Sequence, residues 1–229
     1  MKRRPGAILR RIGVAAASVF IGCAFISLPS DSVSRGRAAL DSYSWRQEPT
    51  GHEIAVSRSA RSFNFAVLGD LSQYSLYLVK DVMHLLSSSS GIALDRKTKY
   101  STVILHDRKV FLRAKTDKKA FNEVGITDEL LAMVMSKVPD DVICNFASLY
   151  QDHDIVYSVI FLSEEHNACL VQGLLASFGV HAESLDFPSL LAMCALYDGR
   201  RLGIRSREAL SREWPRLIGR CVANQGNAG

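Results

Sequence analysis

The segment 154–163 constrains the fold of this chain more than any other. It reads DIVYSVIFLS, and a run this apolar is typical of a central strand buried on both faces of a sheet. Before it, ICNFASLY at 143–150 has the composition of a second strand, and the turn 151–153 joins the two as a β-hairpin. After it, residues 167–178 have the pattern of a helix and end at Gly179, a residue suited to a left-handed helix cap. The sequence therefore predicts a sheet whose central strand leads directly into a helix.

Shorter segments around this unit alternate between strand and helix patterns. Strands are predicted where β-branched or aromatic residues cluster, and helices where apolar residues recur every three or four positions. The other predicted elements are strands at 63–68 and 100–106 and helices at 71–86, 127–138, 189–197 and 206–218. The predicted core face of the 71–86 helix consists of Leu71, Tyr74, Leu78, Val82 and Leu85. The predicted fold class is α+β, with a small mixed sheet packed against helices.

The first 37 residues differ in composition from the rest of the chain. They contain seven basic side chains and one acidic one, a balance of +6, so the other 192 residues, with 21 bases and 22 acids, have a balance of −1. Within them, 17 uncharged residues at 12–28 follow a basic stretch, which is the pattern of a secretory signal or a membrane anchor. The positive-inside rule keeps the basic flank in the cytoplasm, so the remainder is predicted to be exported: periplasmic, membrane-anchored or secreted. Cleavage, lipidation at Cys23 and retention as a membrane contact all stay open.

These patterns divide the chain into four parts. Residues 1–28 are the predicted signal peptide or membrane anchor, and 29–62, rich in Ser, Arg and Gly, are a predicted linker. Residues 63–221 are predicted to form a single α+β domain, since this length suits one hydrophobic core. Residues 222–229 are a predicted disordered tail.

Charge is distributed unevenly within the predicted domain. Residues 117–187 carry twelve acids and three bases, whereas residues 200–220 carry seven arginines and two acids. We interpret both segments as solvated faces, with docking of the arginine-rich segment on the acidic one as the alternative. A nucleic-acid partner is not expected, because no aromatic side chains interleave with the arginines. The expected partner is an envelope protein or a cell-surface ligand.

Five cysteines are present, and four remain if Cys23 is removed or lipidated. Export permits disulfides, but four cysteines allow three pairings that the sequence does not distinguish. No two cysteines form a CxxC pair, which argues against a zinc ribbon or a thioredoxin-like redox site. Cys194, inside the apolar run LLAMCALY, fits a small buried side chain.

The helix at 167–178 stands where zinc metallopeptidases of the zincin type carry the motif HExxHxxG, with two His ligands and a Glu base. Placing the motif glycine on Gly179 puts Gln172 and Ala176 at the ligand positions and Gly173 at the base position. Gln is a poor zinc ligand, and Ala and Gly have no functional group. We therefore expect this helix to pack against the sheet and to bind no catalytic metal.

The same region resembles a bacterial exported family of unknown function, domain of unknown function family 2927, whose fold is similar to that of the zincin metallopeptidases. The resemblance covers residues 60–210 and implies a zincin-like core and a disulfide between Cys144 and Cys169. Many members carry acidic and Gln residues on this helix in place of zinc ligands. The matching pieces are Cys144, Cys169-Leu170, Phe178-Gly179-Val180, Pro188-Ser189 and LYDGRRLG at 196–203, in which Gly199 replaces the Pro of the family.

A few other polar side chains are candidates for function. Glu164, His166 and His181 are the alternative for a surface metal site, although helix capping is the preferred role of residues 164–166. His153 is expected to be solvated in its turn. Residues 197–201 are expected to form a structural turn in which an aspartate binds a backbone amide or an arginine.

The predicted function follows from the leader and from the altered motif. We expect an exported, non-catalytic zincin-like domain that acts as an envelope-associated structural or interaction protein, with no catalytic residues and no cofactor. The alternative is a secreted hydrolase or metallopeptidase-related enzyme with a non-standard residue set, such as a metal held by His166 and His181. A third hypothesis is an anchored module that binds cell-wall or lipid ligands through an apolar cleft.

Overall fold

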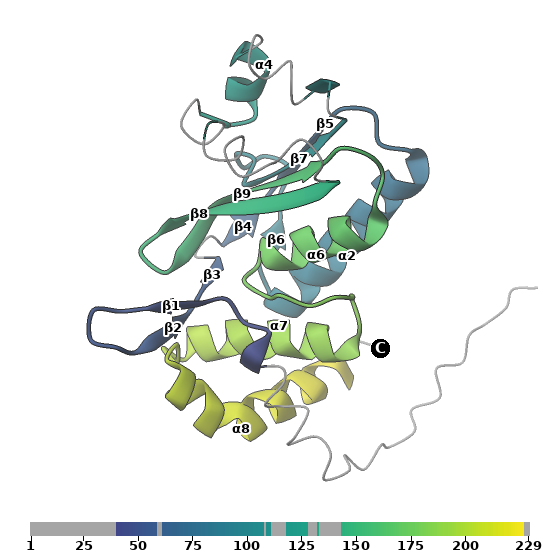
Figure 1. The fold of residues 1–229 in the computed structure, drawn as a ribbon. Helices are drawn as coiled ribbons and strands as arrows, with labels where there is room; N and C mark the ends of the chain where they lie inside the picture. The colour runs from purple at the N-terminus through teal and green to yellow at the C-terminus, as the bar shows by residue number, and fades with distance from the viewer. Residues whose placement is uncertain are drawn as a thin grey trace, which may run out of the picture.

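A computed structural model describes residues 40–58, 61–107, 109–110, 118–127, 132 and 143–226. They form a mixed α/β structure in which a five-stranded sheet packs against helices, consistent with the predicted α+β class (Figure 1). The leader and, apart from two residues, the helix predicted at 127–138 lie outside these ranges. In the part of the chain that the structure describes, no helix combines the length and the apolar character needed to cross a bilayer.

The predicted central strand is β9 (Asp154–Leu162), which organises the five-stranded sheet. One of its edges pairs antiparallel with β8 (Cys144–Gln151), which confirms the predicted hairpin. Its other edge pairs in parallel with β7 (Thr102–His106) and, nearer its start, with β3 (Ser57–Arg58). β7 pairs in parallel with β5 (Phe65–Leu68). Among the described residues, β8 is therefore the antiparallel edge strand of an otherwise parallel sheet.

Helices cover both faces of this sheet (Figure 1). One face presents Ile104 and Ile160 to α2 and α6, and α7 and α8 pack beyond these two helices as a further layer. The opposite face presents Val103 and Val159 to α4, whose Phe121 is buried there. The helices are α2 (Gln73–Ser90), α4 (Lys118–Glu123), α6 (Asn167–Ala176), α7 (Phe187–Arg201) and α8 (Arg207–Gly226).

The predicted linker is folded from Leu40 onward. The side chains of Leu40 and Tyr43 are buried in the core, and the Tyr43 hydroxyl donates to the carbonyl oxygen of Ala192 over 2.6 Å. Strands of two or three residues build this segment, and they are too short to produce a periodic hydrophobic pattern. The prediction of a linker up to residue 62 is therefore wrong from Leu40 onward. Besides β3, the strands are β1 (Trp45–Gln47), β2 (Glu53–Ala55) and β4 (Ser62–Phe63).

The strand predicted at 63–68 is two strands in different sheets. β4 pairs with β6 (Ala93–Leu94), whereas β5 pairs with β7. Asn64 separates them, because its side-chain nitrogen donates to the carbonyl oxygens of Arg96 and Thr98 at 3.3 and 3.1 Å. A buried Asn requires such partners, and meeting this requirement interrupts the ladder.

α2 is rotated relative to its predicted core face. Tyr74 and Leu85, two of the five predicted core residues, are 70% and 41% exposed. Ser75 is buried instead, because its hydroxyl bonds the side chains of Glu165 and Asn167 at 3.3 and 3.0 Å. Helical periodicity does not reveal a buried serine whose partners are distant in sequence. The side chains that α2 buries are Ser75, Val79, Val82, Met83, Leu86 and Ser90.

Several helix ends differ from the sequence prediction. α2 continues past residue 86, its predicted end, through the serines that follow, and is capped by Gly91, which is left-handed with φ 66°. Residues 197–201 lie within α7 rather than in a turn. α8 extends to Gly226, so the tail predicted to be disordered from residue 222 is helical up to that point. The predicted left-handed cap is confirmed at Gly179, where φ is 87°.

Two disulfides cross-link the fold. Cys144 and Cys169 join β8 to α6, as the family resemblance implied. Cys194 and Cys221 join α7 to α8, so Cys194 is not the free buried side chain that its apolar run suggested. Disulfides persist in oxidising compartments, and two of them indicate such an environment for this domain.

Candidate functional site

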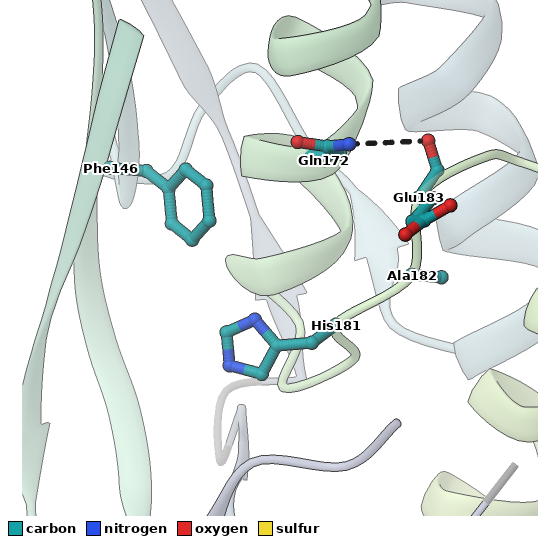
Figure 2. Close-up of a pocket in the computed structure, with 5 residues that line it drawn as sticks. All are labelled: Phe146, Gln172, His181, Ala182 and Glu183. Carbon is teal, nitrogen blue, oxygen red and sulfur yellow. Dashed lines mark hydrogen bonds between the residues drawn. The ribbon is translucent and has the colours of Figure 1, made fainter. Parts of the chain in front are cut away.

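A pocket of about 240 Å³ lies between β8, α6 and the segment that follows α6. Figure 2 shows Phe146 on the strand, Gln172 on the helix and His181 on the following segment, around a common space. Ala182 and Glu183 complete the lining. The pocket therefore includes Gln172, one of the positions onto which the sequence analysis placed the zincin motif.

A covalent cross-link fixes the width of this pocket. Cys144 precedes Phe146 by two residues on β8 and is bonded to Cys169, which precedes Gln172 by three residues on α6. Side chains two apart on a strand, or three apart on a helix, share one face. The disulfide therefore holds strand and helix at a set separation next to the pocket.

The turn after α6 positions His181. It passes through Gly179, where a Cβ would collide with the backbone carbonyl of Val56, so only glycine fits this close approach. The backbone N–H of His181 then donates to the carbonyl oxygen of Ser42. The folded segment before residue 63 is thus part of the frame of the pocket.

The polar groups of the pocket are one imidazole, one carboxamide and one carboxylate. The His181 ring lies 6.2 Å from the Phe146 ring, with 31° between the planes. Partial burial of the imidazole lowers the pKa of His181 from its ordinary value, which favours the neutral form of the ring at pH 7. Gln172 donates from Nε2 to the backbone oxygen of Glu183 over 3.4 Å, and its own side-chain oxygen points to the side of Phe146 (Figure 2). These groups can donate and accept hydrogen bonds beside an aromatic wall.

Gly173 and Ala176, at the other two positions of the zincin motif, allow α6 to pack closely on the sheet. A Cβ added to Gly173 would lie 2.9 Å from Cγ2 of Ile160, closer than side-chain carbons pack. Ala176 is 4% exposed. Small residues at both positions let α6 lie directly on β9, so the predicted packing of this helix on the sheet is confirmed. A glutamate at position 173 has no space in this arrangement.

The structure does not assemble the alternative metal site. His166 caps α6, since its Nδ1 accepts the backbone N–H of Cys169 over 3.2 Å, which is the capping role preferred for this segment. Glu164 is exposed at the same end of the helix. His181 lies beyond the opposite end of α6, a helix of ten residues and hence about 15 Å long. Within the described ranges, no three His, Cys, Asp or Glu side chains are grouped so that they could hold a metal ion.

Sequence reasoning missed Arg58, whose side chain is almost fully buried. Its Nε donates to the carbonyl oxygen of Ser177 and one terminal nitrogen donates to Oγ1 of Thr102, each over 2.6 Å, and the guanidinium lies 5.1 Å from the Phe178 ring. Burial lowers the pKa of Arg58 to about 10. No ion pair within the described residues involves Arg58. One arginine in an unpatterned segment carries no signal of burial, so periodicity could not have found it.

The arginine-rich C-terminal segment makes ion pairs within the domain. One of its partners, Asp154, comes from the acidic middle of the chain, which agrees with the docking alternative for that residue. Others come from the N-terminal segment, from α7, where Asp198 binds arginines as expected, and from α8 itself, where Glu213 pairs with Arg212 and Arg216. The pairs include Arg200–Asp154 at 2.9 Å, Arg207–Glu53 at 2.9 Å and Arg220–Asp198 at 3.0 Å. The turn residue His153 is 2.9 Å from Glu48 and is therefore paired rather than simply solvated.

Comparison with known proteins identifies no relative of this chain. No protein-family model, curated protein or solved structure matches the chain. The family resemblance and the zincin-like core therefore stay predictions, and the geometry of the pocket is the basis of the functional argument.

Proposed function

We propose that this protein is an exported, non-catalytic domain with a zincin-like core, whose pocket beside β8 binds a segment of another envelope protein. The observation that carries the proposal is the contact of Gly173 with Ile160. At the position where a zincin needs its carboxylate base, this contact brings the backbone of α6 onto the sheet. A helix packed in this way is suited to support a pocket rather than to carry a base.

The order of strands and helices supports the zincin-like part of the proposal. Three parallel strands, β5, β7 and β9, are followed at the edge by the antiparallel β8, and α6 begins shortly after β9. The disulfide implied by the family resemblance is present. Export is supported by both disulfides and by the basic and apolar composition of residues 1–28.

The edge strand provides a mode of binding. In the described part of the chain, β8 pairs with β9 alone, and an edge strand can accept an extended segment as an added strand. Such a segment would bring its side chains past the pocket. There the Phe146 ring offers an apolar contact, and the neutral His181 and Gln172 offer hydrogen bonds.

Site-specific photocrosslinking in the producing cells tests this proposal. The photoreactive residue p-benzoylphenylalanine is placed at Phe146 of the full chain, and at Leu202 as a matched control, since Leu202 is 42% exposed at the end of α7. We expect one discrete protein adduct from position 146, weakened by His181→Ala and missing from position 202. No adduct at 146, or the same adduct from both positions, would contradict the proposal.

One observation favours a second candidate, a hydrolase with a non-standard residue set. A neutral imidazole, His181, lines the same pocket as the carboxylate of Glu183, and a neutral imidazole can act as a general base. Ester or peptide turnover by the purified protein that disappears in His181→Ala, with the fold intact, would establish this candidate instead.

A further inference from the structure

A second pocket, of about 400 Å³, lies between α2 and the amino ends of β5 and β7. Lys80 and His84, one helical turn apart, line it from α2, and Arg96 lines it from the loop after β6. Phe65 and Tyr100 form part of its wall. It shares no residue with the pocket beside β8.

The two side chains of this second pocket that are charged at neutral pH, Lys80 and Arg96, are both positive. Lys80, His84 and Arg96 are exposed, and none of them forms an ion pair with a carboxylate in the described part of the chain. No acidic side chain lines the pocket. The nearest acid in the loop, Asp95, accepts the backbone N–H of Lys97 over 2.9 Å and so is engaged in the turn. Cations that converge without a counter-charge attract an anion from solution.

The backbone of the pocket is fixed although its charged side chains are exposed. Asn64 donates to the carbonyl oxygens of Arg96 and Thr98, which ties the loop to the junction of β4 and β5. The backbone N–H of Asp95 donates to the carbonyl oxygen of Phe63 over 2.9 Å. A fixed frame lowers the entropy that is lost when a ligand is bound.

We propose that this pocket binds the phosphate group of a ligand that also has an apolar or aromatic body. The guanidinium of Arg96 and the ammonium of Lys80 can bind several oxygens of one phosphate, which a carboxylate cannot supply in the same number. Phe65, half-buried, and Tyr100, 40% exposed, are available for the body of the ligand. Both soluble phosphate esters and phospholipid headgroups have this chemistry. The inference does not depend on the pocket beside β8.

Binding measurements on the oxidised full chain test the inference. The probes are inorganic phosphate, phenyl phosphate and vesicles of phosphatidylglycerol, with phosphatidylcholine vesicles as the uncharged reference. The variants are Lys80→Gln and Arg96→Gln, and the matched control is Lys97→Gln, which removes an exposed lysine of the same loop that does not line the pocket. Circular dichroism and thermal unfolding verify that each variant is folded.

We expect phenyl phosphate to bind more tightly than inorganic phosphate, because the rings of Phe65 and Tyr100 can contact its phenyl group. Lys80→Gln and Arg96→Gln should each weaken binding about tenfold, the effect of one charge-assisted hydrogen bond, and Lys97→Gln should not change it. Tight binding of phenyl phosphate identifies a soluble ester as the source, whereas binding to phosphatidylglycerol vesicles alone identifies a lipid headgroup. Failure of all three probes at millimolar concentration, or an equal loss in Lys97→Gln, would overturn the inference.

Discussion

Two contacts of opposite chemistry attach α6 to the sheet. In the middle of the helix, Gly173 lies against Ile160 without a polar group between them. Just beyond its end, the buried Arg58 donates to the carbonyl oxygen of Ser177 and to the hydroxyl of Thr102. The first contact depends on volume alone, since one added carbon would collide. The second depends on hydrogen-bond satisfaction, because burial leaves each acceptor without water as a substitute.

The largest expected effect comes from the polar contact. Arg58→Met removes the donor from four acceptors, among which the carbonyl oxygen of Ser177 and Oγ1 of Thr102 form the shortest bonds. A buried acceptor left without a partner costs about 1–3 kcal/mol, so we expect the free energy of unfolding to fall by about 4 kcal/mol from these two alone. Urea denaturation measures this change. Arg61→Met, at an exposed arginine three residues away, is the matched control and should change stability by less than about 0.5 kcal/mol. Equal effects of the two substitutions would show that burial of Arg58 is unimportant.

Loss of either disulfide should lower the stability of the protein, but loss of only one of them should change the geometry of the pocket. The two disulfides close loops of similar length, with sequence separations of 25 and 27, so loss of either should cost about 3 kcal/mol. Only the double substitution Cys144→Ala, Cys169→Ala should alter the NMR signals of the His181 ring, because only that disulfide borders the pocket. The double substitution Cys194→Ala, Cys221→Ala is the control. If it shifts the same signals equally, the disulfide on β8 does not set the width of the pocket.

The stability that comes from the contact between Gly173 and Ile160 should be sensitive to a single added carbon. Gly173→Ala is expected to lower the free energy of unfolding by about 1–3 kcal/mol, because the added Cβ overlaps Ile160. The control is Gly219→Ala in α8, where a Cβ meets nothing within 4 Å, and this substitution should stabilise the protein by about 1 kcal/mol. Calorimetry measures the stability of both variants. A stabilising effect of Gly173→Ala would contradict the prediction, because it would mean that space exists at this position.

The smallest expected effect is the pH dependence of stability that His181 contributes. Burial lowers the pKa of His181, so the unfolded chain takes up the proton first as the pH falls. The stability contributed by the neutral ring is complete above the ordinary histidine pKa of about 6.5 and is lost as the pH falls through the lower folded value. NMR titration should give a pKa below 6.5 for His181, and Phe146→Ala should move it upward. A pKa at or above the ordinary value would contradict the partial burial of the ring.

The sequence predicted those parts of the fold that have long or strongly patterned elements. The hairpin, the central position of β9 and the cap at Gly179 followed from an apolar run, a turn and a glycine. The folded segment from Leu40 and the split at Asn64 did not, because strands of two or three residues have no measurable period. The core face of α2 was misplaced, since Ser75 is buried by partners ninety positions later.

The candidate site was predicted in part. The altered zinc motif pointed to Gln172 and Gly173, and the structure places the first in a pocket and the second in a packing contact. Phe146 was not singled out, because its proximity to His181 depends on the pairing of β8 and on the turn after α6. Arg58 could not be found, since only the tertiary fold buries it.

The central claim is that α6 supports a binding pocket instead of a catalytic metal. Native mass spectrometry of the oxidised protein, incubated with excess zinc and then exchanged into ammonium acetate, tests this claim most directly. We predict no stoichiometric zinc in the wild-type protein and none in His181→Ala. One zinc ion per chain that is lost in His181→Ala would contradict the account.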